Sequence, residues 1–388
     1  MDSQAKNKPV LRFLEFTEKW QERNLKEIAR SISSGKTKQE ADGDYFVYGS
    51  TGKLGLSKYF THNGTFILIA RVGANAGLLN IVTDKFAVTD NTLIFDCNEK
   101  NTIKFIYYLL IRTNLNKLVF GSGQPLITGG QLLSLKTAVP GLPEQQKIAT
   151  FLSAVDEKIR QLSRKKELLT KYKKGVMQQI FDQKIRFKDA EGNKFQDWTT
   201  TRLGDFYKNL STGMTPSRTK REYFAGKVPW ITSGELNFNL IEDTREKITE
   251  EAVRDTNLKV YPPGTLFIAI TGLEAPGTRG KCAINAVSAG TNQSCMAFVE
   301  NASIHTKFLY YWYLQFGIPL YFKFAQGTKQ QSFNNKIVED FLLILPTKPE
   351  QEKIAGFLTT IDKKIDLANT QLEKTKTFKK GLLQQMFV

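Results

Sequence analysis

Basic, amide and hydroxyl side chains stand beside glycines at many probable turns of this sequence, and they fall into two sets. The first set is Lys36, Lys38, Gln39, Ser50, Thr51, Lys53, Arg71, Asn75, Asn91 and Gln124. The second set is Thr215, Ser217, Arg218, Lys220, Arg221, Thr232, Ser233, Thr271, Arg279, Lys281, Asn292, Gln293, Lys329, Gln330 and Gln331. In the major groove of DNA, Arg pairs with guanine and Asn or Gln with adenine, while Lys and hydroxyl groups mostly hold phosphates. Solvated loop polarity would explain any one of these residues, but together they predict contact with a duplex.

The charge of the chain supports the same partner. The 388 residues include 55 Lys and Arg against 38 Asp and Glu, and the formal net charge of +17 favours a polyanion. No apolar run approaches the ~20 residues of a membrane-spanning helix, and the first residues, MDSQAKNKP, lack the apolar stretch of a signal peptide. We therefore expect double-stranded DNA rather than a membrane as partner, and a cytoplasmic location.

The sequence offers little for catalysis. Its two histidines, His62 and His305, have no second ligand at helical spacing, so we expect ordinary surface residues. There is no phosphate-binding G-x-x-x-x-G-K-[ST] loop and no strand-associated G-x-G-x-x-G motif. The cysteines, Cys97, Cys282 and Cys295, are odd in number and scattered, which indicates reduced structural residues. We therefore expect no catalytic residue, no metal site and no cofactor in this chain.

One stretch of the chain occurs twice, and the rest of the sequence is arranged around it. Residues 144–181 and 350–387 align without a gap at a shift of 206 positions, and 17 of the 38 aligned positions are identical. Glycine and proline are nearly absent from both copies, and Pro143 and Pro349 stand just before them. The pattern predicts two long helices, each about 57 Å long at about 1.5 Å per residue.

The apolar residues of both copies recur at steps of three and four, which predicts a coiled-coil seam. The first copy supplies Ile148, Leu152, Val155, Ile159, Leu162, Leu169, Val176 and Ile180; the second supplies Ile354, Leu358, Ile361, Ile365, Ala368, Leu372, Leu382 and Met386. Two independent amphipathic helices, each packed on its own domain, would be the simpler alternative, but a narrow stripe with matched register favours mutual pairing. Charged residues within the repeat, such as Asp156 and Asp362, are expected to form i,i+4 surface pairs rather than a nuclease site.

The segments between the helices are predicted to be two related domains of α+β class with short strands and glycine turns, and the first also contains a helix-like stretch at Thr102–Asn114. We expect a first domain at 1–142, the first helix at 143–183, a second domain at 184–346 and the second helix at 347–388. Arg12, Phe13 and Trp20 recur as Arg186-Phe187 and Trp198, so the segment before the first domain matches the one after the first helix. The internal repeat is therefore circular. The helix sequences are repeated more closely than the domain sequences, as expected for two domains that recognise different sequences and are held at a fixed separation.

Several motifs resemble the specificity subunits of type I restriction-modification systems, and the resemblance covers nearly the whole chain. They are LPEQQKIATFL at Leu142–Leu152 with its second copy at Pro349–Leu358, K-K-G-x-x-Q-Q-x-F at Lys173–Phe181 and Lys379–Phe387, YGSTGKLG at Tyr48–Gly55, and VPWITSGEL at Val228–Leu236. The paired helical repeat is the specific part of this signal.

The resemblance implies a fold and a role that composition does not. In such subunits two target recognition domains each read one half of a bipartite, non-palindromic DNA site, and the two conserved helices pair antiparallel to fix the gap. Two modification subunits methylate adenine with S-adenosylmethionine, and two restriction subunits use ATP and magnesium to translocate and cut DNA. Those cofactors would belong to the partners, and this chain would be non-catalytic. The alternatives are a coiled-coil DNA-binding scaffold without methyltransferase partners, and a nuclease or methyltransferase with an unrecognised motif.

Overall fold

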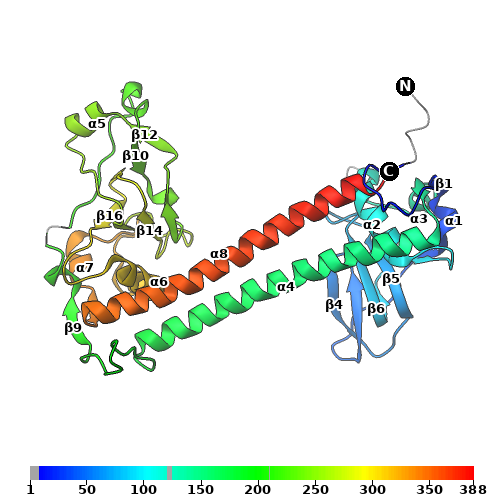
Figure 1. The fold of residues 1–388 in the computed structure, drawn as a ribbon, viewed down its shortest axis with the longest axis horizontal. Helices are drawn as coiled ribbons and strands as arrows, with labels where there is room; N and C mark the ends of the chain where they lie inside the picture. The colour runs from blue at the N-terminus through cyan, green and yellow to red at the C-terminus, as the bar shows by residue number, and fades with distance from the viewer. Residues whose placement is uncertain (1–7, 120–124, 209) are drawn as a thin grey trace. The chain divides into compact units, whose positions relative to one another are not determined.

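The computed structural model describes residues 8–119, 125–208 and 210–388 (Figure 1). It divides into two compact units: unit 1 comprises Met1–Lys165 and Ala368–Val388, and unit 2 comprises Lys166–Leu367. Two long helices, α4 (Leu142–Phe181) and α8 (Lys348–Gln385), each contribute one part to each unit. We call the remaining globular part of a unit its head, residues 8–141 in unit 1 and 182–347 in unit 2.

Both long helices begin earlier than the repeated sequence suggests. They start at Leu142 and Lys348, so Pro143 and Pro349 lie inside the first turn rather than before it. The first-turn N–H groups have no partner within a helix, and proline therefore costs nothing at this position.

The head of unit 1 is built on a six-stranded sheet in the order β2-β7-β5-β6-β3-β4. The strands are β2 (Ala29–Ser34), β3 (Tyr45–Gly49), β4 (Gly52–Ser57), β5 (His62–Ala70), β6 (Leu79–Val88) and β7 (Thr92–Cys97). Successive side chains of a strand point to opposite faces. Ile67 and Ile69 of β5 accordingly join the main core with α2 (Ile103–Thr113), while Leu68 joins a smaller cluster with Phe86 on the other face.

A two-stranded sheet and short helices complete this head. Strand β1 (Gln21–Asn24) pairs antiparallel with β8 (Lys136–Val139), just before α4 begins. The short helices are α1 (Leu25–Ile28), the 3₁₀ turn η2 (Leu115–Leu118) and α3 (Gly129–Leu133). At α3 the hydroxyl of Thr128 accepts a hydrogen bond from the N–H of Gln131, which caps the helix.

The head of unit 2 divides its strands between two main sheets, in the orders β11-β14-β13-β16 and β12-β10-β15. The first holds β11 (Asn239–Ile241), β13 (Leu266–Ala269), β14 (Cys282–Asn285) and β16 (Cys295–Phe298); the second holds β10 (Val228–Ile231), β12 (Glu246–Ile248) and β15 (Gly290–Thr291). Its helices are η3 (Leu203–Asp205), η4 (Arg221–Phe224), η5 (Ser233–Glu235), α5 (Glu250–Asp255), α6 (Thr306–Phe324) and α7 (Asn335–Glu339). Strand β9 (Thr199–Arg202) pairs antiparallel with β17 (Leu342–Leu345), as β1 does with β8.

Within each unit the beginning of one long helix packs against the end of the other, so the helices run antiparallel. In unit 1, Leu152 of α4 shares a core with Leu382 of α8, and in unit 2, Ile180 of α4 shares a core with Leu358 of α8. Of the predicted seam residues, Ile159, Leu169 and Ile365 are half-buried and the others are buried.

The buried stripe on each long helix is wider than a coiled-coil seam near the heads. Ala149 and Phe387 in unit 1, and Met177 and Phe181 in unit 2, are buried in the cores beside the seam residues. The expectation of a narrow stripe is therefore wrong near the heads, because each helix packs there on a head and on the other helix at once.

A buried carboxylate fixes each head to the start of a long helix. In unit 1, Arg12 donates two hydrogen bonds of 2.7 Å to Glu144, and the indole N–H of Trp20 donates a third of 3.2 Å. In unit 2, Glu350 accepts the corresponding pair from Arg186 at 2.8 and 3.0 Å. Both carboxylates are almost inaccessible to solvent, so their charge must be balanced by these partners.

Candidate nucleic-acid interface

Five segments that carry most of the first set of candidates are held together at one edge of the unit 1 head. We call them the first rim: residues 35–39, 48–51, 71–75, 88–91 and 125–128. Backbone hydrogen bonds join them, from Thr37 N to Val88 O (2.9 Å), Thr89 N to Tyr48 O (2.9 Å), Arg71 N to Asn91 O (3.0 Å), Gly73 N to Pro125 O (2.9 Å) and Ile127 N to Arg71 O (2.9 Å). The fold thus brings side chains that are up to about ninety positions apart in sequence into one surface.

The unit 2 head joins five segments by the same pattern. The second rim comprises residues 213–217, 231–233, 270–273, 291–294 and 331–333. Its bonds run from Met214 N to Thr291 O (2.9 Å), Asn292 N to Ile231 O (3.1 Å), Ile270 N to Ser294 O (2.9 Å), Leu273 N to Gln331 O (3.0 Å) and Phe333 N to Ile270 O (2.8 Å). The two heads therefore hold corresponding loops in place although their side chains differ.

One glycine in each rim is required by close backbone packing. A Cβ atom on Gly35 would lie 2.1 Å from the carbonyl oxygen of Val88, and one on Gly213 would lie 1.8 Å from that of Thr291. Any other residue would have to push the neighbouring segment away, so these two positions keep the first and fourth segments of each rim in contact.

Most of the first set is accessible to a ligand. Lys36, Lys38, Gln39, Lys53, Thr51, Asn75 and Asn91 are exposed, and Ser50 and Arg71 are half-buried. Lys53 lies in β4 rather than in a turn, and its ammonium stands 3.4 Å from the ring centroid of Phe46. Arg71 Nε is buried and makes no hydrogen bond within the part of the chain that the structure describes. Gln124 lies outside the described residues.

The second set is less uniformly exposed. Ser217, Arg218, Lys220, Arg221, Gln293, Lys329 and Gln330 are exposed, whereas Thr215, Thr232, Ser233, Thr271, Arg279, Lys281, Asn292 and Gln331 are half-buried. Arg221 and Ser233 begin the short 3₁₀ turns η4 and η5. Thr232 donates to the carboxylate of Glu235 at 2.9 Å, which ties its hydroxyl to the structure of η5.

Arg218 is an exposed arginine with a protein partner. Its guanidinium donates to Glu246 with one bond of 2.8 Å, and it lies 4.2 Å from the ring centroid of Phe224. This pairing holds the pKa of Glu246 below its usual range. An ion pair this exposed contributes only about 0–1 kcal/mol, so exchanging the carboxylate for a phosphate would cost little.

The guanidinium of Arg279 is held more firmly than that of Arg218. Its Nε donates to the carbonyl of Leu273 at 2.9 Å and its Nη2 to that of Glu274 at 2.8 Å, while the guanidinium lies 4.4 Å from the ring of Tyr321. Its Nη1 makes no hydrogen bond within the described residues. A side chain fixed in this way loses little freedom on binding, which suits an arginine that pairs with a base or a phosphate.

The sequence-based predictions were wrong for two aspartates inside the helical repeat and for the exposure of the two histidines. Asp156 and Asp362 do not form i,i+4 pairs; each bonds a lysine of the other long helix. His62 and His305 are half-buried rather than on the surface, and burial lowers the pKa of both. Identity between the two repeat copies is the signal that marks these aspartates, since a freely solvated residue has no need to recur.

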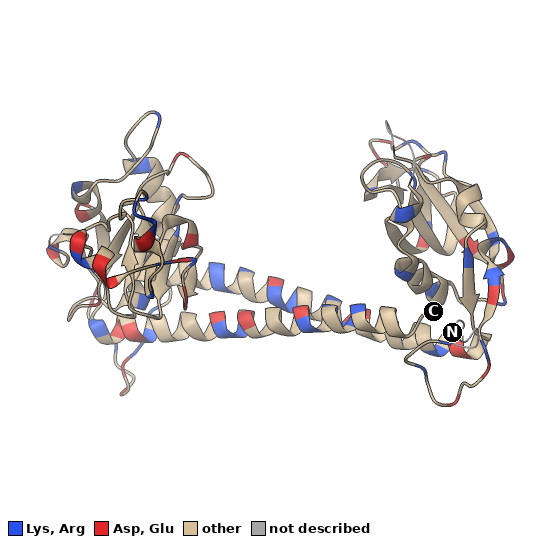
Figure 2. Cartoon of the chain, turned by 90° about the horizontal axis from the view of Figure 1, so that it is seen from above, with Lys and Arg blue, Asp and Glu red and all other residues tan. Residues whose placement is uncertain are grey.

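Among residues 8–119, 125–208 and 210–388, no three His, Cys, Asp or Glu side chains are grouped to hold a metal ion, and no helix is long and apolar enough to cross a membrane. The three cysteines are buried, and burial raises the pKa of Cys97 to about 11 and that of Cys295 to about 12. Positive and negative side chains are interspersed along both long helices (Figure 2).

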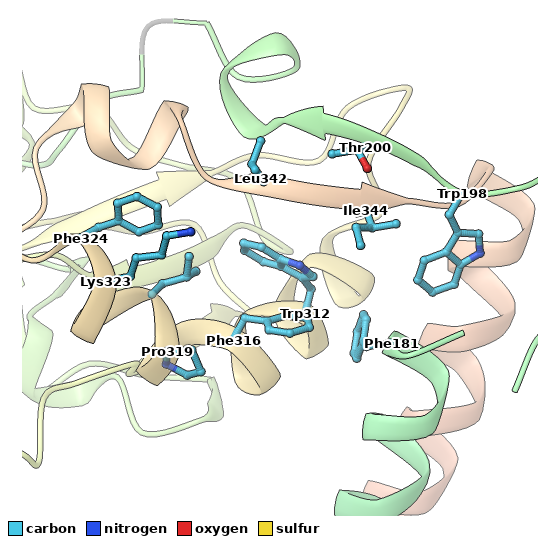
Figure 3. Close-up of a pocket in the computed structure, with 11 residues that line it drawn as sticks. Phe181, Trp198, Thr200, Trp312, Phe316, Pro319, Lys323, Phe324, Leu342 and Ile344 are labelled. Carbon is cyan, nitrogen blue, oxygen red and sulfur yellow. The ribbon is translucent and has the colours of Figure 1, made fainter. Parts of the chain in front are cut away.

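An apolar groove lies on the unit 2 head between α6 and the β9–β17 sheet (Figure 3). It encloses about 300 Å³ and is lined by Phe181, Trp198, Thr200, Trp312, Phe316, Pro319, Leu320, Lys323, Phe324, Leu342 and Ile344. Lys323 is the one charged residue in this lining. The groove therefore offers neither a nucleophile nor an acid–base pair.

A protein-family model described as a type I restriction modification DNA specificity domain matches residues 17–171 and again residues 196–377. The chain belongs to this family. Each match covers one head and most of the long helix that follows it. The chain is thus a DNA specificity subunit with two copies of the domain, which confirms the resemblance seen in its motifs.

Relatives of similar organisation are found among type I restriction enzymes. The MjaVIII specificity subunit of Methanocaldococcus jannaschii is 24% identical over 402 residues, which cover 95% of this chain and 92% of the relative. The MjaIX specificity subunit of the same organism is 27% identical over 213 residues, or 54% of this chain, and the match spans about half (48%) of that relative.

A solved structure confirms the predicted fold class. The crystal structure of a type I restriction-modification S subunit from M. genitalium matches with a TM-score of 0.68 and 18% identity, covering 98% of this chain and 99% of that one. The architecture is two heads of mixed α/β structure joined by two long antiparallel helices.

Proposed function

We propose that each head reads one half of a bipartite, asymmetric DNA site and that α4 and α8 set the number of unread base pairs between the halves. The observation that carries this proposal is that the same five-segment rim is built twice, with corresponding backbone hydrogen bonds and different side chains. A shared scaffold with different contact residues is what two independent readers of different sequences need.

The long helices have a second role in the proposal, which is to dock two modification subunits. Tyr172 and Phe378 occupy equivalent positions of the two repeat copies, and both are aromatic and more than half exposed. Aromatic side chains are enriched at protein interfaces. A feature repeated at equivalent positions fits two copies of one partner.

The complete system would divide the chemistry among its subunits. This chain would be non-catalytic and hold no cofactor, S-adenosylmethionine would bind the two modification subunits, and ATP and magnesium would serve two restriction subunits. The complex would act on DNA in the bacterial cytoplasm.

A map of adenine methylation across the host genome, with and without this gene, tests the proposal. We expect a gapped, asymmetric motif that disappears when the gene is deleted, and its two specified parts would be the half-sites. An unchanged methylation map, together with failure of modification subunits to co-purify with the tagged chain, would overturn the proposal in favour of a DNA-binding scaffold.

A further inference from the structure

Three elements of unit 1 meet at a single carboxylate. Oδ1 of Asp156, on α4, lies 2.6 Å from the ammonium of Lys379, on α8. Its Oδ2 accepts a hydrogen bond of 2.7 Å from the hydroxyl of Tyr108, on α2 of the head. One side chain therefore joins both long helices and the head.

Unit 2 contains the same junction, built from the equivalent positions of the repeat. Oδ1 of Asp362, on α8, lies 2.6 Å from the ammonium of Lys173, on α4, and Oδ2 accepts 2.7 Å from the hydroxyl of Tyr311, on α6. In both junctions the lysine also lies over the tyrosine ring, 5.1 Å from the centroid in unit 2 and 5.4 Å in unit 1.

The apolar seam alone does not define the register of the helices. A seam with a period of seven residues is satisfied again after a slip of one heptad, which is about 10.5 Å. A polar pair at one position of a seam is satisfied in a single register, and this is a well-attested use of partly buried charges. The lysine and aspartate side chains are 17% and 29% exposed in unit 2 and 19% and 36% in unit 1, so a slip would leave poorly solvated charges without partners.

The tyrosines extend this constraint from the helices to the heads. Burial raises the pKa of Tyr108 and of Tyr311 well above its usual value, so both hydroxyls stay protonated and donate throughout the physiological pH range. Each head is thereby bonded to the residue that ties the two helices together. A change of helix register would therefore also break the hydrogen bond between the tyrosine of the head and the aspartate.

We propose that Asp156 and Asp362, each with its lysine and tyrosine, are positioning residues. They fix both the register of the two helices and the position of the head on those helices, and so restrict the subunit to one spacer length. This inference rests on the proposed function of the helices. It assigns the choice of spacer to two polar junctions as well as to helix length. A slip of one heptad is about 10.5 Å and one base pair is about 3.4 Å, so such a slip would shift the preferred spacer by about three base pairs.

The test is methylation mapping in a host whose gene encodes Asp156→Asn together with Asp362→Asn. Asparagine keeps the size and the acceptor for tyrosine but removes the charge that holds the lysine. We expect methylation at sites with both half-sites intact and a spacer about three base pairs longer or shorter to rise about tenfold, the effect of a coupling typical for neighbouring charged groups. Glu157→Gln is the matched control, because Glu157 is adjacent in sequence but its partners among the described residues, Arg160 and Gln161, lie on its own helix. This variant should leave the spacer unchanged.

Charge reversal separates positioning from general stability. Combining Asp362→Lys with Lys173→Asp, and Asp156→Lys with Lys379→Asp, restores opposite charges across the helices and should return methylation to the original spacer. Loss of methylation in equal proportion at every spacer, or a spacer unaltered in the double asparagine variant, would overturn the inference. Absence of any gapped motif with the wild-type gene would instead overturn the proposed function.

Discussion

A groove lies at corresponding elements of both heads, but its lining is apolar in unit 2 and of mixed polarity in unit 1. In unit 2, α6 and the β9–β17 sheet present Trp312, Leu342 and Ile344, while in unit 1 the corresponding α2 and β1–β8 sheet present Arg112, Glu22 and Lys136 to a cavity of about 400 Å³. The scaffold therefore tolerates either lining. Features that recur in both units, such as the rims and the buried carboxylates, reflect what the fold requires, and features that differ reflect what each head does.

The largest expected effect comes from removing a feature that both units share. Glu350→Ala leaves the guanidinium of Arg186 without its buried partner, and breaking such a pair costs about 3–5 kcal/mol. We expect a marked fall in the urea midpoint of unit 2, measured by circular dichroism. Glu352→Ala, an exposed residue of the same turn, is the control; equal effects of the two variants would show that the carboxylate is not an anchor.

The rim glycines should give the next largest effect. Gly213→Ala places a methyl group 1.8 Å from a carbonyl oxygen, and overpacking of this kind costs about 1–3 kcal/mol. Binding to DNA that carries the half-site of the second head should fall, measured by fluorescence anisotropy with the assembled complex. Gly234→Ala, whose Cβ would meet nothing closer than 3.8 Å, should bind normally; if it is equally impaired, the rim packing is not the cause.

Arg279, which bonds Leu273 of the second rim, sharpens the comparison because no arginine in the described segments of the first rim is fixed in the same way. Arg279→Ala should weaken binding by about 1–3 kcal/mol if the guanidinium pairs with a base. The loss should depend on the base changed in the second half-site and not on the first half-site, as measured with duplexes altered in either half. A loss that is uniform across all sequences would identify a phosphate contact, and no loss would remove Arg279 from the interface.

The smallest effect is expected from changing the groove lining, which differs between the two units. Leu342→Lys with Ile344→Ala gives the unit 2 groove two residues of its unit 1 counterpart. Both side chains are more than 40% exposed, so stability should change by no more than about 0.5 kcal/mol, while binding of an apolar fluorescent dye should fall. A large loss of stability would mean that the apolar lining is structural.

The sequence predicted the two long helices because these depend on local periodicity and on a repeat visible in the chain itself, whereas their antiparallel pairing was implied only by the family resemblance. It placed Lys53 wrongly in a turn because residue type does not distinguish the start of a short strand from a loop. The partner of Asp156 was not predictable, since Lys379 is far away in sequence and i,i+4 neighbours were available. The rims depend on long-range backbone hydrogen bonds, which leave no pattern in side-chain type.

Exchange of one head tests the central claim most directly. Residues 20–140 would be replaced by the corresponding segment of another specificity subunit, and the methylated motif of the host genome would be mapped before and after. Independent heads on a fixed helical frame predict that one half-site changes while the other half-site and the spacer stay the same. A change in both half-sites, or in the spacer, would contradict the account.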